Sequence, residues 1–439
     1  MLENMLKKVT GIRSDEVKAS LLAFAYFFCV LSAYYVLRPL REEMGLAGGV
    51  RNLPWLFIGT LLATLVLAPL FGTLVSRYKR SQFITISYRF FAINLLLFYL
   101  LMLYSDAEMD VVLGRVFYIW LSAFNLFVVS VFWSFVADGF GYERSRRLFA
   151  FLAAGGTTGA IVGASITSGL VEVIGRLHLM LFSVVLLELA VRIVHALNKE
   201  FAQYEPDDAL PETPIGEKQS IVEQMSAGIS LTIRSPYLLG ISGYLLLYSF
   251  LSTFLYFEQA NIINSALESR TERTALFAQI DLWVNSLTLL MQIFLTGHLM
   301  RKLGITLVLV IVPILTVAGF ISLAFAPVLV TLVIFQVVRR AGSYALSRPA
   351  RETLFTILGR EEKYKAKNFI DTFVYRTGDA LSAGLNGLLA MIGLGVASVA
   401  WVAVPFAVLW TAVGGWLGHK QSELLEQGNK NKSKPMEKQ

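Results

Sequence analysis

Stretches of about 20 predominantly apolar residues recur along almost the whole chain and are separated by short polar segments. That length is what an α-helix needs to cross a bilayer. The short alternating segments that form transmembrane β-barrels do not occur. We therefore predict an all-α membrane protein. Its twelve predicted transmembrane helices are 17–40, 54–75, 82–105, 111–137, 148–173, 177–197, 237–262, 276–300, 304–325, 327–347, 367–391 and 395–418.

The longest polar stretch follows the sixth predicted span and holds Pro206, Pro211, Pro214 and several acidic residues. This composition is typical of a linker, so we expect two six-helix bundles on either side of it. The predicted parts are the N-terminal bundle 1–197, the cytoplasmic linker 198–236, the C-terminal bundle 237–418 and a basic cytoplasmic tail 419–439.

A weak internal repeat supports two related halves. Gly72 to Arg77 follows the second predicted span, and Gly297 to Lys302 follows the eighth, which is its equivalent in a chain of two six-helix repeats. The run Gly72-Thr-Leu-Val-Ser-Arg77 resembles the loop signature of the major facilitator superfamily, although Ser76 stands where that signature usually has an acid. The resemblance implies two pseudo-symmetric six-helix bundles of the major facilitator type.

Composition narrows the class of protein. The chain has 439 residues, of which 56% are hydrophobic and 16% charged, whereas soluble domains carry about 25% charged residues. The net charge of +7 does not indicate a nucleic-acid-binding protein, because the basic residues form no single patch. The one cysteine, Cys29, lies inside the first predicted span, which excludes a disulfide framework or a cysteine-based metal site.

The distribution of Lys and Arg predicts the orientation. Basic residues gather in loops on one side of the predicted topology, and such loops are cytoplasmic. We therefore expect both termini in the cytoplasm of a multi-pass protein of the bacterial inner membrane. The polar first 16 residues lack the apolar region and cleavage site of a signal peptide.

The first predicted span ends with charged side chains, which are unfavourable inside a membrane. Tyr34, Arg38 and Arg41 are spaced i, i+4, i+7 and share one helix face, with Glu42 beside them. An arginine at the centre of a membrane helix costs about 2.5–3.5 kcal/mol on insertion scales, and it usually faces a cavity. We interpret this face as half of an anion-binding site. The alternative is that Arg41 and Glu42 lie at the outer interface.

The C-terminal half carries matching polar positions. Glu258 in the seventh span could pair with an arginine, carry a proton or lie at the interface. The tenth and eleventh spans carry polar stripes that must face protein or water, and Arg339 lies about 100° from Arg340 on the helix. The stripe residues are Gln336, Arg340, Ser343, Ser347 and Arg351 in the tenth span, and Lys367, Asp371, Tyr375, Asp379, Ser382 and Asn386 in the eleventh.

These stripes indicate an aqueous pathway. For Arg351, Lys365 and Lys367, which are near the membrane edge, a buried ion-pair network that gates the cytoplasmic end is the alternative. The glycines from Gly155 to Gly163 in the fifth span predict close helix packing.

The sequence shows no soluble catalytic site. No phosphate-binding GK[ST] loop occurs, and none of the four histidines has the spacing of a zinc pair. We therefore predict no enzyme activity, no cofactor and no metal, and we exclude an ATP-driven pump.

Three short motifs resemble the nucleotide transporter family, the ATP/ADP translocases of plastids and intracellular bacteria. Leu37 to Glu42 is similar to its Leu-Arg-x-x-Lys-Asp pattern, Pro349 to Glu352 to its Pro-x-Lys-Glu pattern, and Lys365 to Asp371 to its Lys-x-Lys-x-x-Ile-Asp pattern. An acid in the family's seventh span would fall near Glu258. The resemblance implies nucleotide exchange or uptake, with basic residues on the phosphates and acids gating or coupling. Arg41 and Arg351 replace family lysines, which keeps the charge but changes its geometry.

Together these patterns predict a secondary transporter that works by alternating access on an organic anion, such as a nucleotide or phosphorylated metabolite, by exchange or proton coupling. It is expected to be a monomer in the bilayer. The predicted substrate-binding residues are Tyr34, Arg38, Arg41, Arg340, Arg351, Lys367 and Tyr375. The predicted coupling or gating residues are Glu42, Glu258, Lys365, Asp371 and Asp379. The alternatives are a proton-coupled exporter of amphipathic compounds and a membrane scaffold or receptor.

Overall fold

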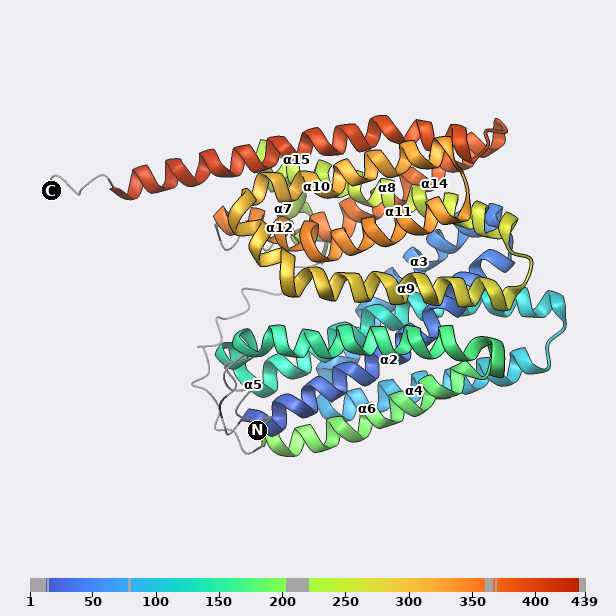
Figure 1. Ribbon diagram of the computed structural model, residues 1–439. Helices are drawn as coiled ribbons and strands as arrows, with labels where there is room; N and C mark the ends of the chain where they lie inside the picture. The colour runs from blue at the N-terminus through green and yellow to red at the C-terminus, as the bar shows by residue number, and fades with distance from the viewer. Residues whose placement is uncertain are drawn as a thin grey trace. The chain divides into compact units, whose positions relative to one another are not determined.

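Every regular element of the computed structural model is a helix over the residues that it describes, which are Arg13, 16–77, 80–202, 221–359, 366–367 and 369–433. Figure 1 shows their course along the chain. The helices of the first part are α2 (Val17–Ala47), η2 (Val50–Asn52), α3 (Leu53–Arg77), α4 (Arg80–Leu103), α5 (Ala107–Ile174) and α6 (Leu179–Phe201).

The chain continues with α7 (Ile221–Arg234) and α8 (Pro236–Ala266). The remaining helices are α9 (Arg270–Met291), η3 (Gln292–Thr296), α10 (Gly297–Phe325), α11 (Leu329–Gly342), η4 (Ser343–Ser347), α12 (Arg348–Leu354), η5 (Phe355–Ile357), η6 (Ile370–Val374), α14 (Tyr375–Met391) and α15 (Val396–Ser433). Of these, η3, η4 and η6 are π-helical turns inside longer helices.

Within the described residues, ten helical segments are long and apolar enough to cross a membrane. One of them, Arg270–Phe325, has 56 residues and covers two predicted spans, 276–300 and 304–325. Apolar side chains such as Leu65 and Ile93 are 59% and 65% exposed, as expected of helix faces that contact lipid tails. The prediction of an all-α, multi-pass membrane protein is confirmed.

The boundaries differ from the predictions in a few places. The first helix continues past residue 40 to Ala47, with Pro39 inside it. The predicted linker 198–236 contains α7, and its residues 203–220 lie outside the described part of the chain. Gly141 has a φ of +73°, a backbone conformation that glycine adopts more readily than other residues. Its non-helical backbone breaks α5 between the predicted fourth and fifth spans.

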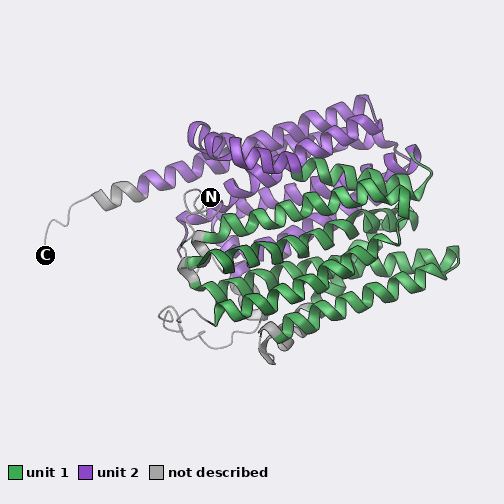
Figure 2. Ribbon diagram, turned by 60° about the horizontal axis from the view of Figure 1, so that its bottom comes forward, with its two compact units in different colours: residues 1–212, 267–285 green, residues 213–266, 286–439 purple. Residues whose placement is uncertain are grey.

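The chain forms two compact units. Unit 1 comprises Met1–Glu212 and Leu267–Asn285, and unit 2 comprises Thr213–Ala266 and Ser286–Gln439. Figure 2 colours them separately. The first part of α9 therefore belongs to unit 1, although it lies in the second half of the sequence. The predicted division into bundles 1–197 and 237–418 stays a prediction, and it assigns residues 267–285 to the second bundle.

In unit 1, α2 packs mainly on α5 and α6. The glycines of α5 make the approach to α2 very close, as predicted: a Cβ on Gly159 would lie 2.4 Å from the Phe28 carbonyl oxygen. The Ser32 hydroxyl donates a hydrogen bond of 2.9 Å to the Gly159 carbonyl across the same interface. A small-residue stripe of this kind lets two backbones meet inside a membrane.

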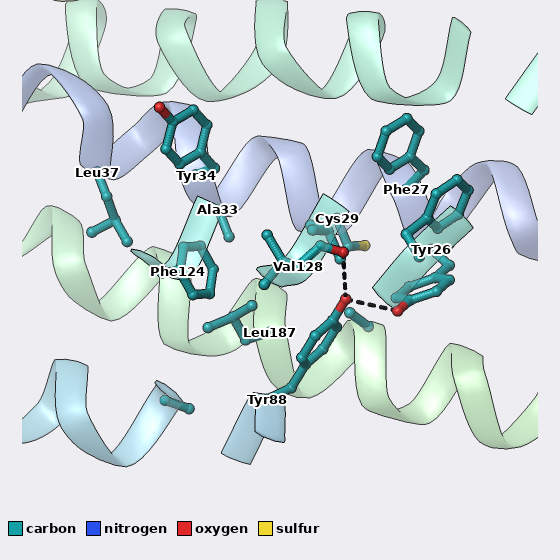
Figure 3. Close-up of a cluster of buried hydrophobic side chains, with 14 of the residues drawn as sticks. Tyr26, Phe27, Cys29, Ala33, Tyr34, Leu37, Tyr88, Phe124, Val128 and Leu187 are labelled. Carbon is teal, nitrogen blue, oxygen red and sulfur yellow. Dashed lines mark hydrogen bonds between the residues drawn. The ribbon is translucent and has the colours of Figure 1, made fainter. Parts of the chain in front are cut away.

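A cluster of hydrophobic side chains, many of them aromatic, is buried in unit 1 (Figure 3). The hydroxyls of Tyr26 and Tyr88 share a hydrogen bond of 2.7 Å, and Tyr88 also donates to the Val128 carbonyl at 3.5 Å. Phe27 stacks on Phe132 with ring centroids 4.0 Å apart. The hydroxyls of both tyrosines are buried, and these hydrogen bonds give them the partners that buried polar groups need.

In unit 2, α8 packs on α14 and α15, and α10 packs on α15 and α11. Gly378 of α14 lies so close to α8 that an added Cβ would be 2.6 Å from the Leu246 carbonyl oxygen. The Tyr244 hydroxyl donates to the Leu309 carbonyl at 2.9 Å and links α8 to α10. These contacts fix the helices that carry the polar residues of unit 2.

Candidate functional site

The predicted face of α2 has an ionic partner. The Arg38 guanidinium donates a hydrogen bond of 2.5 Å to the Asp281 carboxylate of α9. The side chain of Asp281 is only 3% exposed and that of Arg38 17%. Glu42 lies one turn along α2, with 3.9 Å between its carboxylate and the Arg38 guanidinium. Arg38 is thus held by carboxylates inside unit 1.

The other predicted residues of this face lie close by. Arg41 places its guanidinium 4.2 Å from the centre of the Tyr118 ring and 3.7 Å from the Glu42 carboxylate. Tyr34 and Glu42 are each 7% exposed. The structure therefore brings Tyr34, Arg38, Arg41 and Glu42 together, as their helical spacing predicted.

A second ionic cluster in unit 1 was not predicted. The Arg270 guanidinium donates to both oxygens of Glu43, at 2.6 and 3.1 Å, and also to Asp110. Arg176 donates to Glu43 at 3.3 Å and to Asp110 at 2.8 Å, while Arg273 lies 3.6 Å from Glu43. Because Glu43 is fully buried, these arginines supply the charge that its burial requires.

Unit 2 contains two arginines, Arg339 and Arg348, that form no ion pair with a described carboxylate. Arg339 of α11 is 5% exposed and donates to the Ser252 hydroxyl at 2.8 Å and the Gln336 amide oxygen at 3.4 Å. Arg348 at the start of α12 is exposed, and its guanidinium lies 4.5 Å from the centre of the Tyr344 ring. Among the described residues, no carboxylate oxygen lies within 4 Å of either guanidinium.

The same three tyrosines are neighbours of both guanidiniums. Tyr248, Tyr344 and Tyr375 are electrostatic neighbours of Arg339 and of Arg348, and Arg348 is within hydrogen-bonding reach of the Tyr248 hydroxyl. The Tyr248 and Tyr375 rings are 6.3 Å apart. A guanidinium that forms no ion pair with a carboxylate can accept an anion, for which arginine offers paired donors. We refer to Arg339, Arg348, Tyr248, Tyr344 and Tyr375 as the arginine–tyrosine cluster.

The π-helical turn η4 explains why this cluster differs from the predicted stripe. A π-helical turn holds one residue more than an α-helical turn, so it shifts the register of every residue that follows. The helical spacing predicted that Ser343, Ser347 and Arg351 lie on the same helix face as Arg340. The structure instead continues the face through Tyr344 and Arg348, and it buries Ser343 and Ser347. Arg340 itself is half-buried on α11.

Arg351 and Lys367 lie in a different cluster near the end of α12. Arg351 is 3.3 Å from the Glu352 carboxylate and 3.6 Å from the Asp371 carboxylate, and Lys367 pairs with Glu352. These residues are brought together as ion pairs, which corresponds to the gating alternative. Lys365 lies outside the described residues.

The two buried acids of unit 2 have opposite surroundings. Asp379 accepts hydrogen bonds from Ser249 at 2.5 Å and Thr253 at 2.7 Å, with Arg376 at 3.4 Å. Glu258 is fully buried, and the Asn386 amide donates to it at 3.4 Å. Asp379 therefore has the partners that a carboxylate needs, whereas Glu258 does not.

Sequence analysis missed several of these residues for identifiable reasons. Asp281 is a charge inside the predicted span 276–300, a signal that could have marked it. Arg348 falls just after the predicted end of the tenth span, where the pattern indicates a loop. Arg270 and Arg273 precede the eighth predicted span, and nothing in the sequence pairs them with Glu43.

No protein-family model matches the chain, and no curated protein matches it. Solved structures do. The POT family transporter PepTSo superposes with a TM-score of 0.63 at 13% identity, over 92% of this chain and 98% of that one. The nucleoside transporter NupG gives 0.54 at 12% identity over 94% and 99%. A bacterial homologue of the human lysosomal transporter Spinster gives 0.56 at 14% identity over 94% and 99%.

These identities show the fold alone. The chain has the helical fold of these transporters, and the predicted major facilitator type of architecture is confirmed. The resemblance of three short motifs to the nucleotide transporter family stays a prediction.

Proposed function

We propose that this protein is a secondary active transporter for a small organic anion, with a nucleotide or phosphorylated metabolite as the substrate to test first. The observation that carries the proposal is the arginine–tyrosine cluster of unit 2. Arg339 and Arg348 bring two positive charges into a membrane-spanning region, and among the described residues no carboxylate oxygen lies within 4 Å of either guanidinium. Since each such charge costs a few kcal/mol in a membrane helix, a ligand anion is the natural counter-charge.

The three tyrosines give the cluster its second chemical feature. Their rings and hydroxyls offer flat apolar surface together with hydrogen-bond donors, which suits a planar group attached to an anion. One of the solved structures with this fold, NupG, is a nucleoside transporter. This supports a substrate with a planar base, and the motif resemblance adds the phosphate, so a nucleotide is the first substrate to test.

A substrate shifts a transporter between conformations only if it binds one of them more tightly than the other. Arg38 is held by Asp281 in this structure. An anionic substrate that replaced the Asp281 carboxylate would couple its own binding to the release of α9. Arg38 is therefore proposed to bind substrate only in a state other than the one described.

Reconstituted proteoliposomes provide the test. Uptake of labelled ADP, labelled glucose 6-phosphate and labelled inorganic phosphate would be measured with and without the same compound inside. We expect saturable exchange of at least one phosphorylated organic compound. Arg348→Gln should raise its KM roughly 10- to 100-fold, because a hydrogen bond to a charged group contributes about 1.5–3 kcal/mol.

The matched control is Arg192→Gln, which removes an arginine that is 77% exposed and paired with Glu188. It should leave uptake unchanged. Saturable uptake with the same KM in Arg348→Gln and Arg339→Gln would reject the cluster as the anion site. Transport of ethidium but of no anion would favour the exporter of amphipathic compounds.

A further inference from the structure

Glu258 is a carboxyl group inside a membrane-spanning helix with almost nothing to stabilise a negative charge. It lies on α8, within the candidate span Pro236–Ala266, and is fully buried. The Asn386 amide donates to its Oε1 at 3.4 Å, and its Oε2 has no hydrogen-bond partner among the described residues. Within the same part of the chain, no Lys, Arg or His nitrogen lies within 4 Å of this carboxyl group.

None of the described charged groups on the elements packed against α8 lies within 4 Å of the Glu258 carboxyl group. On α14, Arg376 and Asp379 lie 3.4 Å from each other. On α11, Arg339 contacts Ser252 and Gln336, and next to it lies Arg340. The remaining described charged side chains of these elements are Asp371 in η6, Arg234 in α7, and His419, Lys420, Glu423 and Glu426 near the end of α15. None of these forms an ion pair with Glu258.

Asp379 is an internal comparison in the same unit. It is 8% exposed, yet two hydroxyls donate to it and a guanidinium lies beside it. A carboxylate with such donors is stable as an anion, whereas a buried carboxylate without a cation is not. The neutral acid is therefore the form of Glu258 that fits this environment.

We propose that Glu258 is a proton-binding site that couples substrate movement to the proton gradient. The inference rests on the proposed transport function and adds the coupling ion to it. When Glu258 becomes accessible to water on one side, its carboxylate takes a proton from hydronium, an O–H bond forms and water is left. Burial then requires that the group stay neutral. Release on the other side breaks the O–H bond and returns the proton to water.

Asn386 has a positioning role in this scheme. Its amide contacts Oε1 in the described state. The amide can form a hydrogen bond with either the neutral acid or the carboxylate, because it offers both a donor and an acceptor. It orients the carboxyl group without stabilising the carboxylate form. A lysine or arginine at the same place would stabilise that form.

The first experiment separates coupling from transport. Wild-type proteoliposomes, with the membrane potential clamped, should accumulate labelled ADP when an inward proton gradient is imposed, and an internal pH dye should report proton entry. Glu258→Gln should abolish this accumulation while ADP exchange against internal ADP persists. Glu258→Asp, which keeps a carboxyl group, should retain measurable accumulation. Glu188→Gln, a change at a surface pair with Arg89, is the matched control and should behave as wild type.

The second experiment needs no substrate. Infrared spectra of the detergent-solubilised protein at rising pH should contain a protonated carboxyl band that Glu258→Gln removes and Glu188→Gln keeps. Absence of that band, or gradient-driven accumulation in Glu258→Gln equal to wild type, would overturn the proton site. Failure of ADP, sugar phosphate and phosphate to be transported, with the band present, would reject the proposed substrate class and leave the proton site standing.

Discussion

The Arg38 guanidinium of α2 donates a 2.5 Å hydrogen bond to the Asp281 carboxylate of α9, across 243 positions of sequence. Both side chains lie in unit 1, although Asp281 comes from the second half of the chain. A partner of opposite charge is what allows each of them to be buried. The pair therefore ties the first part of α9 to α2.

This pair should behave as a coupled unit in a double-mutant cycle. Arg38→Gln removes the guanidinium that donates to the nearly buried Asp281 carboxylate at 2.5 Å, and breaking a buried pair in this way costs about 3–5 kcal/mol. The double variant Arg38→Gln with Asp281→Asn should recover much of that loss. Thermal unfolding in detergent would measure all four proteins. Additive effects of the two changes would contradict the coupling.

The ionic cluster around Glu43 should fasten the start of α9. Arg270→Gln removes three of the hydrogen bonds to Glu43 and Asp110. We expect a loss of roughly 1–3 kcal/mol in stability, together with faster labelling of a cysteine placed at Ser269. Labelling by a membrane-impermeant maleimide, with and without Arg270→Gln, is the measurement.

The same label provides the control for that experiment. Arg192→Gln should leave the labelling rate at Ser269→Cys unchanged, since its partner Glu188 lies on the surface of α6. Equal labelling rates in all three proteins would show that Arg270 does not hold the segment.

The α2–α5 interface should be intolerant of a single methyl group. A Cβ at Gly159 would lie 2.4 Å from a backbone oxygen of α2, which a side-chain rotation cannot relieve. Gly159→Ala should therefore cost about 1–3 kcal/mol or more. Gly169→Ala on the same helix meets nothing within 4 Å and should be neutral or slightly stabilising. Apparent melting temperatures in detergent would distinguish the two, and equal values would contradict the packing.

The buried tyrosine pair in Figure 3 should show an asymmetric response. Tyr88→Phe leaves the Tyr26 hydroxyl without its partner, because Tyr26 makes no other hydrogen bond within the described part of the chain, and an unsatisfied buried hydroxyl costs about 1–3 kcal/mol. Tyr26→Phe should cost less, because Tyr88 keeps the Val128 carbonyl. Unfolding measurements on both variants and on the double variant test this order.

The orientation predicted from the basic loops awaits a direct measurement. A reporter that fluoresces only in the cytoplasm, fused after residue 439, should be active if the C-terminus is cytoplasmic. A periplasmic reporter at the same position should be silent. The opposite result would reverse the predicted topology.

Local periodicity was sufficient for some of the candidate site. Tyr34, Arg38, Arg41 and Glu42 lie within a few turns of one helix, and that helix is continuous through them. Their common face therefore followed from spacing. The same rule failed at the tenth span, because the π-helical turn Ser343–Ser347 adds a residue that no periodic pattern reveals. Arg348 thus joins Arg339, while Arg351 lies with Glu352 and Asp371.

By itself, the sequence determined the helical membrane class, most of the spans and the glycine-mediated packing of the fifth. These depend on length, apolarity and side-chain size, which are local properties. Only the tertiary structure decided which charges have partners. Arg38 meets Asp281, Arg270 meets Glu43, Arg339 and Arg348 meet no described carboxylate, and Glu258 meets an amide. The physical reason is that the stability of a buried charge depends on its nearest neighbours in space, and those neighbours come from distant helices.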